Sequence, residues 1–300
     1  MQENSQEQLI KPIFWTQTRT FRLFVIPGVS MYSFFAILPI LLGIYYSLTD
    51  WNGYSRKFNF VRFENFTKII QDERFLNSLN FTFRFTIMLV LFVTIISIII
   101  AVLLNSKIKG ITTIRAIYFF PAVMSLLTVS LIFNQIYYRA MPVIGKLLGT
   151  DLFNGILASP TKAFWGVLFA NLWKGVAIPS ILFLAALQTI PITVIEAAII
   201  DGASSFKRFF KIELPFLLPI LSVVCVLALK QGILVFDSIM GLTGGGPAGS
   251  TESVSFLIYQ HGFVENKFSY SIAESIVTGI IIAIISAIQI GFLNKRKITL

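Results

Sequence analysis

The sequence predicts an all-α integral membrane protein with six transmembrane helices, and two observations support this prediction. First, the 300-residue chain is 56% hydrophobic and only 13% charged, and its mean hydropathy is +0.81. Soluble domains contain about 25% charged residues, so these values exclude a water-soluble globule. Second, apolar runs of about 20 residues, the length that a helix needs to cross a bilayer, recur along the chain.

Six such runs define the predicted spans, and charged residues border most of them. The first run follows Arg22, and the last ends at a short basic stretch. Two runs contain a lysine, Lys174 in the fourth and Lys230 in the fifth. The predicted spans cover residues 23–48, 85–106, 116–138, 163–187, 216–236 and 275–294.

Two segments outside the spans have predicted roles of their own. Residues 1–22 are expected to form a cytoplasmic tail, which leaves residues 23–300 as the membrane domain. Residues 60–79 are predicted to contain a short helix on the outer surface, because apolar residues such as Phe66, Ile69 and Ile70 recur there at helical spacing.

Composition also argues against several kinds of chemistry. The net charge of +10 does not indicate nucleic-acid binding, because the basic residues lie at the ends of apolar runs, where lipid headgroups are found. Cys225 is the only cysteine, so an intrachain disulfide or a cysteine metal cluster is impossible. His261 is the only histidine and is expected in a surface loop. We predict no catalytic residue, no metal site and no cofactor, and we do not expect an enzyme.

A charged insert, residues 188–215, separates the fourth and fifth spans. Glu196-Ala197-Ala198 lies in a predicted short helix, and Gly202 is expected to end it. The three residues are followed by Gly202 at +6, an isoleucine at +16 and Leu-Pro at +18 and +19. This pattern resembles the EAA loop of bacterial ABC-importer permeases, in which a thin, strongly helical segment is gripped by another protein.

The resemblance implies how the insert acts. In such permeases the first helix sits in a cleft of the ATP-binding subunit and passes the motion of that subunit to the membrane helices. Glu196 would be the charged contact, and the fit would come from Ala197, Ala198, Asp201 and Gly202. The implied partners are a second homologous permease, two ATP-binding-cassette ATPases that hydrolyse the ATP, and an extracellular solute-binding protein.

The second half of the insert is predicted to form another short amphipathic helix. Ser204 or Ser205 can cap its start. Phe206, Phe209 and Phe210 share one face, which we expect to lie against the other membrane helices or the lipid interface.

Three further stretches resemble carbohydrate-importer permeases, including those for maltose, multiple sugars and glycerol phosphate. They are FVIPGVSMYSFFAILPILLGIYYSLTDW in the first span, RFENFTKIIQDERFLNSLNFT after it, and FDSIMGLTGGGPAGSTESVSFLIYQHGF after the fifth span. The last contains a glycine loop that lacks the Gly-Lys-Ser/Thr ending of a phosphate-binding loop. We expect either a flexible external turn or a re-entrant loop near the transport path or the binding protein.

The orientation depends mainly on the same resemblance. Basic residues divide almost equally between the two sides of the predicted topology, so the positive-inside rule alone does not decide it. Placing the EAA loop in the cytoplasm puts both termini there, in a bacterial cytoplasmic membrane.

The expected substrate path lies between the fourth and fifth spans. A lysine inside a bilayer is costly, so Lys174 is expected to face a wet cavity or a partner helix. We assign Lys174, Gly175, Gln231, Gly232 and Asp237 to the path. The alternative is that these groups join the two permease subunits.

The sequence is thus interpreted as the permease of an ATP-driven importer of a carbohydrate, with an oligosaccharide as the expected cargo. A glycerol-phosphate-like polyol is the alternative substrate. A stand-alone secondary transporter would need an acidic relay in the spans and internal repeats, which the sequence does not display. A membrane enzyme is disfavoured because catalytic clusters are lacking.

Overall fold

The computed structural model describes residues 13–294 apart from 107 and 108, and in this part of the chain it contains helices and no strand beyond one isolated bridge between Thr49 and Phe60. Four helical segments are long and apolar enough to cross a membrane, and two bent helix pairs raise the number of spans to as many as six. The prediction of an all-α membrane protein is confirmed.

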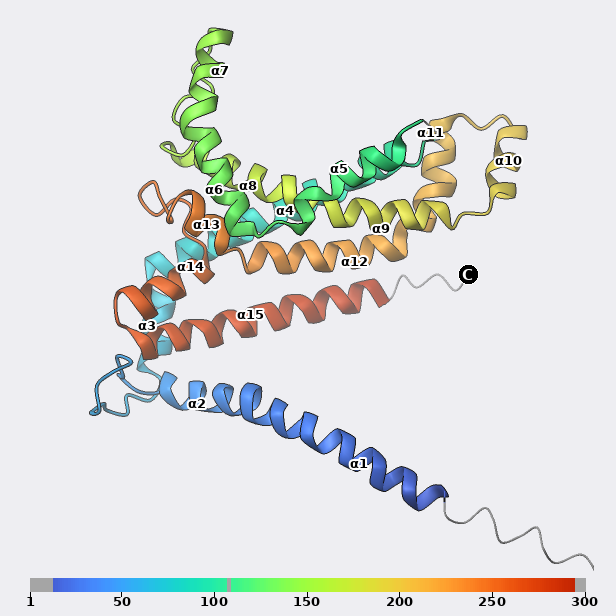
Figure 1. Ribbon diagram of the computed structural model, residues 1–300. Coiled ribbons are helices and arrows are strands. Elements are labelled where there is room, and N and C mark those ends of the chain that lie inside the picture. The colour runs from blue at the N-terminus through green and yellow to red at the C-terminus, as the bar shows by residue number, and fades with distance from the viewer. Residues whose placement is uncertain (1–12, 107–108, 295–300) are drawn as a thin grey trace, which may run out of the picture.

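The first span consists of α1 (Ile13–Tyr32), a π-helical turn and α2 (Leu38–Ser47). The helix begins inside the segment expected to be a tail, while residues 1–12 of that tail lie outside the described residues. Apart from Ser47 at its end, the apolar stretch Phe24–Ser47 is not buried against the rest of the chain. α1 diverges from the bundle, and only α2 approaches the last helix, α15 (Phe268–Asn294) (Figure 1).

The centre of the bundle is α4 (Glu73–Leu104), which packs against α9 (Ala177–Gln188) and α12 (Leu214–Ile233). Phe85, Leu89 and Val93 form one fully buried stripe along α4 because they repeat every four residues. α4 starts earlier than the predicted second span, since Asp72 caps it by accepting hydrogen bonds from two backbone amides. The predicted outer helix before it is α3 (Glu64–Gln71).

The third predicted span is not one straight helix. α5 (Ile111–Val123) ends at Met124, whose backbone is extended, and α6 (Leu126–Gln135), a π-helical turn and α7 (Met141–Leu148) follow at an angle of 99°. Pro121 lies in the last turn of α5, and proline is poorly compatible with helix interiors.

The fourth and fifth spans precede and follow the charged insert in the chain. α8 (Pro160–Gly175) and α9 form the fourth span with a bend of 43°. After α12 the chain forms α13 (Asp237–Leu242), the glycine loop and α14 (Val254–Tyr259), and a π-helical turn then leads to α15. α10 (Ile192–Ile200) and α11 (Ser205–Arg208) lie at the opposite end of the bundle from α3, α7 and α14 (Figure 1).

Candidate functional site

The insert presents α10 as a protruding helix. α10 starts after Pro191 and ends at Asp201, and Gly202 follows in the left-handed conformation with φ of +73°. The amide of Ala203 donates to the carbonyl of Ala198 and that of Gly202 to Ile199, each at 3.0 Å. This closure of a helix end by a left-handed glycine was expected, because glycine adopts positive φ without steric cost.

The surface of α10 is open along most of its length. Glu196, Ala197, Asp201 and Gly202 are exposed, and Ala198 alone of the predicted contact residues is buried. Ile200 is 85% exposed, and Glu196 forms no ion pair with any residue of the described ranges. An exposed helix with small, apolar and acidic side chains is suited to docking in a groove of another protein.

The second half of the insert differs from the prediction. Ser204 caps α11 by accepting a hydrogen bond from the amide of Lys207, but α11 continues through a π-helical turn into α12 as one helix. The π-helical turn precedes Pro215, which lacks an amide hydrogen, so the irregularity falls where the regular hydrogen-bond ladder would be broken.

The three phenylalanines of this helix do not share one environment. Phe209 packs against the core, whereas Phe206 is 75% exposed and its ring centroid lies 4.5 Å from that of Phe210. Of the two expected surroundings for this face, the other membrane helices are therefore excluded for Phe206 and Phe210 within this chain, and contact with the lipid interface stays a prediction. They extend the exposed apolar surface beside α10.

Three of the predicted path residues come together around one cavity. Lys174, Gly175 and Gln231 line a space of about 270 Å³ between α8, α9, α12 and the end of α5. A methyl group added at Gly175 would lie 3.2 Å from the Gln231 side-chain nitrogen. The side chains of Lys174 and Gln231 therefore line this cavity together. Lys174 forms no ion pair with any described residue.

The other two predicted path residues lie elsewhere. A Cβ atom at Gly232 would lie 2.8 Å from the Cα atom of Thr86, so Gly232 is a point of close approach between α12 and α4. Asp237 is the exposed first residue of α13 and does not line the cavity. The helix rotates Gly232 away from the cavity and ends before Asp237, so neither residue lines it.

The glycine loop is held in place by hydrogen bonds. The Thr251 hydroxyl contacts the Thr243 hydroxyl at 2.8 Å and donates to the Gly246 carbonyl at 2.6 Å, and the amide of Val254 donates to the Thr82 hydroxyl at 3.0 Å. These contacts show that the loop is ordered and anchored to α4 rather than freely flexible.

Sequence reasoning missed two polar contacts inside the bundle. The Asn171 amide donates to the Ser238 hydroxyl at 2.9 Å, and the Asn134 amide donates to the Leu242 carbonyl at 3.1 Å. Both fix α13 against α6 and α8. These contacts can be seen only in the folded structure, because an asparagine in an apolar run does not indicate which distant segment it will contact.

The expectation that His261 lies in a surface loop is wrong. Its side chain is 3% exposed, and its Nδ1 atom lies 2.9 Å from a carboxylate oxygen of the fully buried Glu274. Its Nε2 atom lies 3.5 Å from Arg74, which forms two hydrogen bonds with Glu252 and pairs with Glu265. Burying these polar and ionisable groups is feasible because each one has a hydrogen-bond partner.

Ligand atoms of Asp72, His261 and Glu274 lie within 4.8 Å of one another, a spacing that could hold a metal ion. The Asp72 carboxylate, however, already accepts a hydrogen bond from Tyr270 and caps α4, and the Arg74 guanidinium stands beside His261. This arrangement is better suited to an ion-pair network than to a cation site, because the arginine already supplies the positive charge.

At the rim of this network, hydrogen bonding changes the pKa of one carboxylate. Lys267 and, less strongly, Arg74 lower the pKa of Glu265 from 4.5 to about 2. Lys267 Nζ lies 2.7 Å from the carboxylate. Glu265 therefore stays charged well below its ordinary range, and the network joins α4, the glycine loop and the start of α15.

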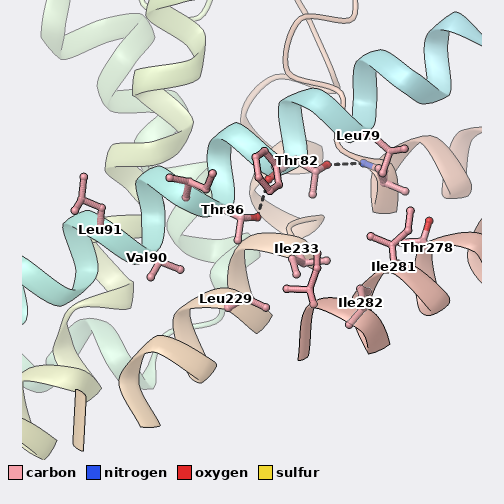
Figure 2. A pocket seen from close by; sticks show the side chains of 14 residues that line it. Leu79, Thr82, Thr86, Val90, Leu91, Leu229, Ile233, Thr278, Ile281 and Ile282 are labelled. Carbon is pink, nitrogen blue, oxygen red and sulfur yellow. Dashed lines mark hydrogen bonds between the residues drawn. The ribbon is translucent and has the colours of Figure 1, made fainter. Parts of the chain in front are cut away.

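A second groove has a different character. Thr82, Thr86 and Val90 of α4 face Ile233 of α12 and Ile281 of α15 across a space of about 410 Å³ (Figure 2). The Thr86 hydroxyl is already used, since it donates to the Thr82 carbonyl. This groove has an almost wholly apolar lining and offers little to a hydroxylated ligand.

Known proteins with related sequences are permease proteins of transport systems, several of them for sugars. The chain is 42% identical over 275 residues to the multiple sugar-binding transport system permease protein MsmF of Streptococcus mutans, which covers 91% of the chain and 94% of that protein. It is 34% identical to the trehalose/maltose transport system permease protein MalF of Thermococcus litoralis, over 85% of the chain and 86% of that protein. It is 30% identical to the sn-glycerol-3-phosphate transport system permease protein UgpA of Brucella abortus, over 90% of the chain and 93% of that protein.

The fold also has a solved counterpart, although no protein-family model matches the chain. A chain from a bacterial ABC transporter involved in the import of the acidic polysaccharide alginate superposes with a TM-score of 0.81. The match covers 95% of the chain and 99% of that structure at 20% identity, and shows the fold alone. Together with the sequence identities, this fold identifies the chain as a member of the family of sugar ABC-importer permeases.

Proposed function

We propose that this permease takes up an oligosaccharide across a bacterial cytoplasmic membrane, with α10 as the coupling helix and the Lys174–Gln231 cavity on the substrate path. The single observation that carries the proposal is α10 itself. It is an exposed helix with an acidic residue and two alanines, closed by a left-handed glycine and held away from the bundle.

Coupling follows from the rigidity of the connections of α10. The two capping hydrogen bonds close α10 at Gly202, only two residues separate Gly202 from α11, and α11 is continuous with α12. A displacement of α10 by an ATPase subunit would therefore move α12, which carries Gln231 into the cavity. ATP hydrolysis is assigned to the partner subunits, and the permease transmits the resulting motion from α10 to α12.

The proposed assembly contains a second permease, two ATPases and an extracellular solute-binding protein, with both termini of this chain in the cytoplasm. Support for a second permease comes from the family resemblance, and the exposed first span leaves an apolar surface free for lipid or for that subunit. A solved structural neighbour, a bacterial alginate ABC transporter, forms a complex with an alginate pentasaccharide-bound periplasmic protein. This supports an oligosaccharide handed over by such a protein.

A phosphorylated polyol is the second candidate substrate. Lys174 is a cation facing the cavity, and cations bind phosphate more strongly than they bind neutral hydroxyls. The UgpA relatives act in sn-glycerol-3-phosphate transport. Uptake of labelled glycerol phosphate by cells that contain this permease, compared with labelled di- and trisaccharides, separates the two substrates.

Two substitutions test the path directly. Lys174→Leu or Gln231→Leu should change which sugar is carried or its half-saturation, while ATPase copurification stays normal because α10 is untouched. Losing one hydrogen bond costs about 0.5 to 1.5 kcal/mol, or up to ~3 with the charged lysine, which is a few-fold to about a hundred-fold in affinity. Unchanged uptake kinetics together with lost permease pairing would assign these groups to the subunit interface instead.

Glu196→Lys tests the coupling helix. We expect the variant to reach the membrane but to lose copurification of the ATPase and transport-linked ATP hydrolysis, because the acidic contact is reversed. Normal values for both would remove Glu196 from the ATPase contact.

A further inference from the structure

A third cavity, larger than the other two, lies at the end of the bundle opposite α10. It is a groove of about 580 Å³ between the first turns of α4, the start of α8 and the glycine loop. Asn77, Asn80 and Arg84 line it from α4, Trp165 from α8 and Ser250 from the loop. It is separate from the Lys174–Gln231 cavity, with which it shares no lining residue.

The polar groups of this groove lack partners within the described part of the chain. Arg84 forms no ion pair there, and the side chains of Asn77 and Asn80 form no hydrogen bonds. The Ser250 hydroxyl is buried and likewise has no partner. No acidic residue lines the groove, so its one full charge is positive.

The polar side chains that α4 contributes lie toward its start. Asn77, Asn80 and Arg84 alternate there with Phe81 and Phe83, and beyond Arg84 the α4 lining is wholly apolar, with Ile87 and Met88. From Asn77 to Met88 the helix rises about 16 Å at 1.5 Å per residue. The 20 residues after Arg84 are apolar enough to cross the hydrocarbon core, so Arg84 stands at the membrane boundary. Trp165, 48% exposed, is typical of that depth.

We propose that this groove binds an anionic phospholipid, with the phosphate at Arg84 and an acyl chain along Ile87, Met88 and Trp165. The positive charge of Arg84 favours an occupant with a negatively charged phosphate. An unpaired guanidinium surrounded by amide and hydroxyl donors matches phosphate oxygens, which accept two parallel hydrogen bonds from arginine. A free sugar would use the polar end and leave the apolar end unmatched, whereas a lipid fills both.

Native mass spectrometry of the full chain, solubilised from its membrane, tests the proposal. Detergent micelles would contain equal amounts of phosphatidylglycerol, phosphatidylcholine and a diacyl glycolipid without phosphate. The wild-type protein should retain phosphatidylglycerol preferentially. Arg84→Gln should weaken that retention about ten-fold to a hundred-fold, the effect of losing a charged hydrogen bond. Arg56→Gln, at an exposed arginine outside the groove, is the control and should bind like the wild type.

Two further measurements keep the test decisive. If Arg84→Gln does not fold, Asn80→Leu should still lower retention, because it removes a donor at the exposed surface without removing charge. Bromine on the acyl chain of phosphatidylglycerol should quench Trp165 fluorescence, and a Trp165→Phe variant identifies that signal. Equal retention by Arg84→Gln and wild type, or equal retention of the glycolipid, would overturn the proposal. So would cross-linking of Asn80→Cys to another subunit across the groove.

Discussion

Gly175, whose Cα faces the Gln231 side chain, and Gly232, which follows Gln231 in the chain, provide a sharp test of which residues line the transport path. Gly175→Ala places a methyl group 3.2 Å from Nε2 and 3.3 Å from Oε1 of Gln231. Both atoms are the far end of a flexible side chain, so Gln231 can rotate, and the cost in folding free energy should stay below about 1 kcal/mol. The displaced amide should instead change the half-saturation for sugar a few-fold.

Gly232→Ala is the matched control, because the same methyl group meets a rigid obstacle. It would lie 2.8 Å from the Cα and Oγ1 atoms of Thr86 and 2.9 Å from its Cβ atom. α4 and α12 must separate, and overpacking of this kind costs about 1 to 3 kcal/mol. Up to about 1 kcal/mol is recovered because alanine favours helix over glycine. We expect lower thermal stability with normal half-saturation per folded molecule.

The assay is uptake of labelled sugar into proteoliposomes that contain the complete transporter, combined with thermal unfolding of the same preparations. The reasoning fails if Gly175→Ala destabilises the protein as much as Gly232→Ala does while its half-saturation stays normal. Gly175 would then be a packing contact, and the cavity would not lie on the path. A double-mutant cycle with Gln231→Ala should show that the Gly175 effect depends on that side chain.

Two further predictions concern the turn after α10 and the ion pairs at the opposite end. Gly202→Ala should lower ATPase-coupled uptake modestly and Gly202→Val more, because φ is +73° and a β-branched residue tolerates the left-handed region least; equal activity of the two variants would contradict this. Since the folded-state pKa of Glu265 is lowered to about 2, its contribution to stability is complete above its ordinary value of 4.5 and is lost as the pH falls toward 2. Lys267→Met should raise the folded-state pKa of Glu265, so that the acid loss of stability becomes smaller and is complete at a higher pH. Chemical unfolding at pH 7 and at low pH, followed by tryptophan fluorescence, would reveal this; an unchanged difference between the two pH values would argue against this link.

The sequence could predict the features that depend on local patterns. Apolar length located the spans, and the first one was placed within a residue or two of the stretch Phe24–Ser47. Gly202 was identified as the end of α10 because a helix terminus with positive φ needs glycine. Lys174 and Gln231 line one cavity, as is expected for polar groups inside a span that must avoid lipid, while their place on the substrate path stays a prediction.

The missed features depend on partners that are distant in sequence. His261 resembled a loop residue because Glu274 appeared only as the edge of the next span, yet the fold buries them together. The 99° bend in the third span was hidden by continuous hydrophobicity, which does not distinguish a straight helix from a broken one. Gly232 and Gln231 are neighbours in sequence, but one meets Thr86 and the other faces the cavity.

The central claim is that α10 docks against an ATPase subunit, and site-directed cross-linking tests it most directly. Ala197 is exposed on α10, so Ala197→Cys in a Cys225→Ser background places a single thiol there. With a short bifunctional maleimide, Ala197→Cys should cross-link to the ATPase, and Arg56→Cys in an exposed loop at the other end should not. The account would be contradicted if the ATPase copurified without cross-linking to Ala197→Cys, or if it cross-linked to Arg56→Cys instead.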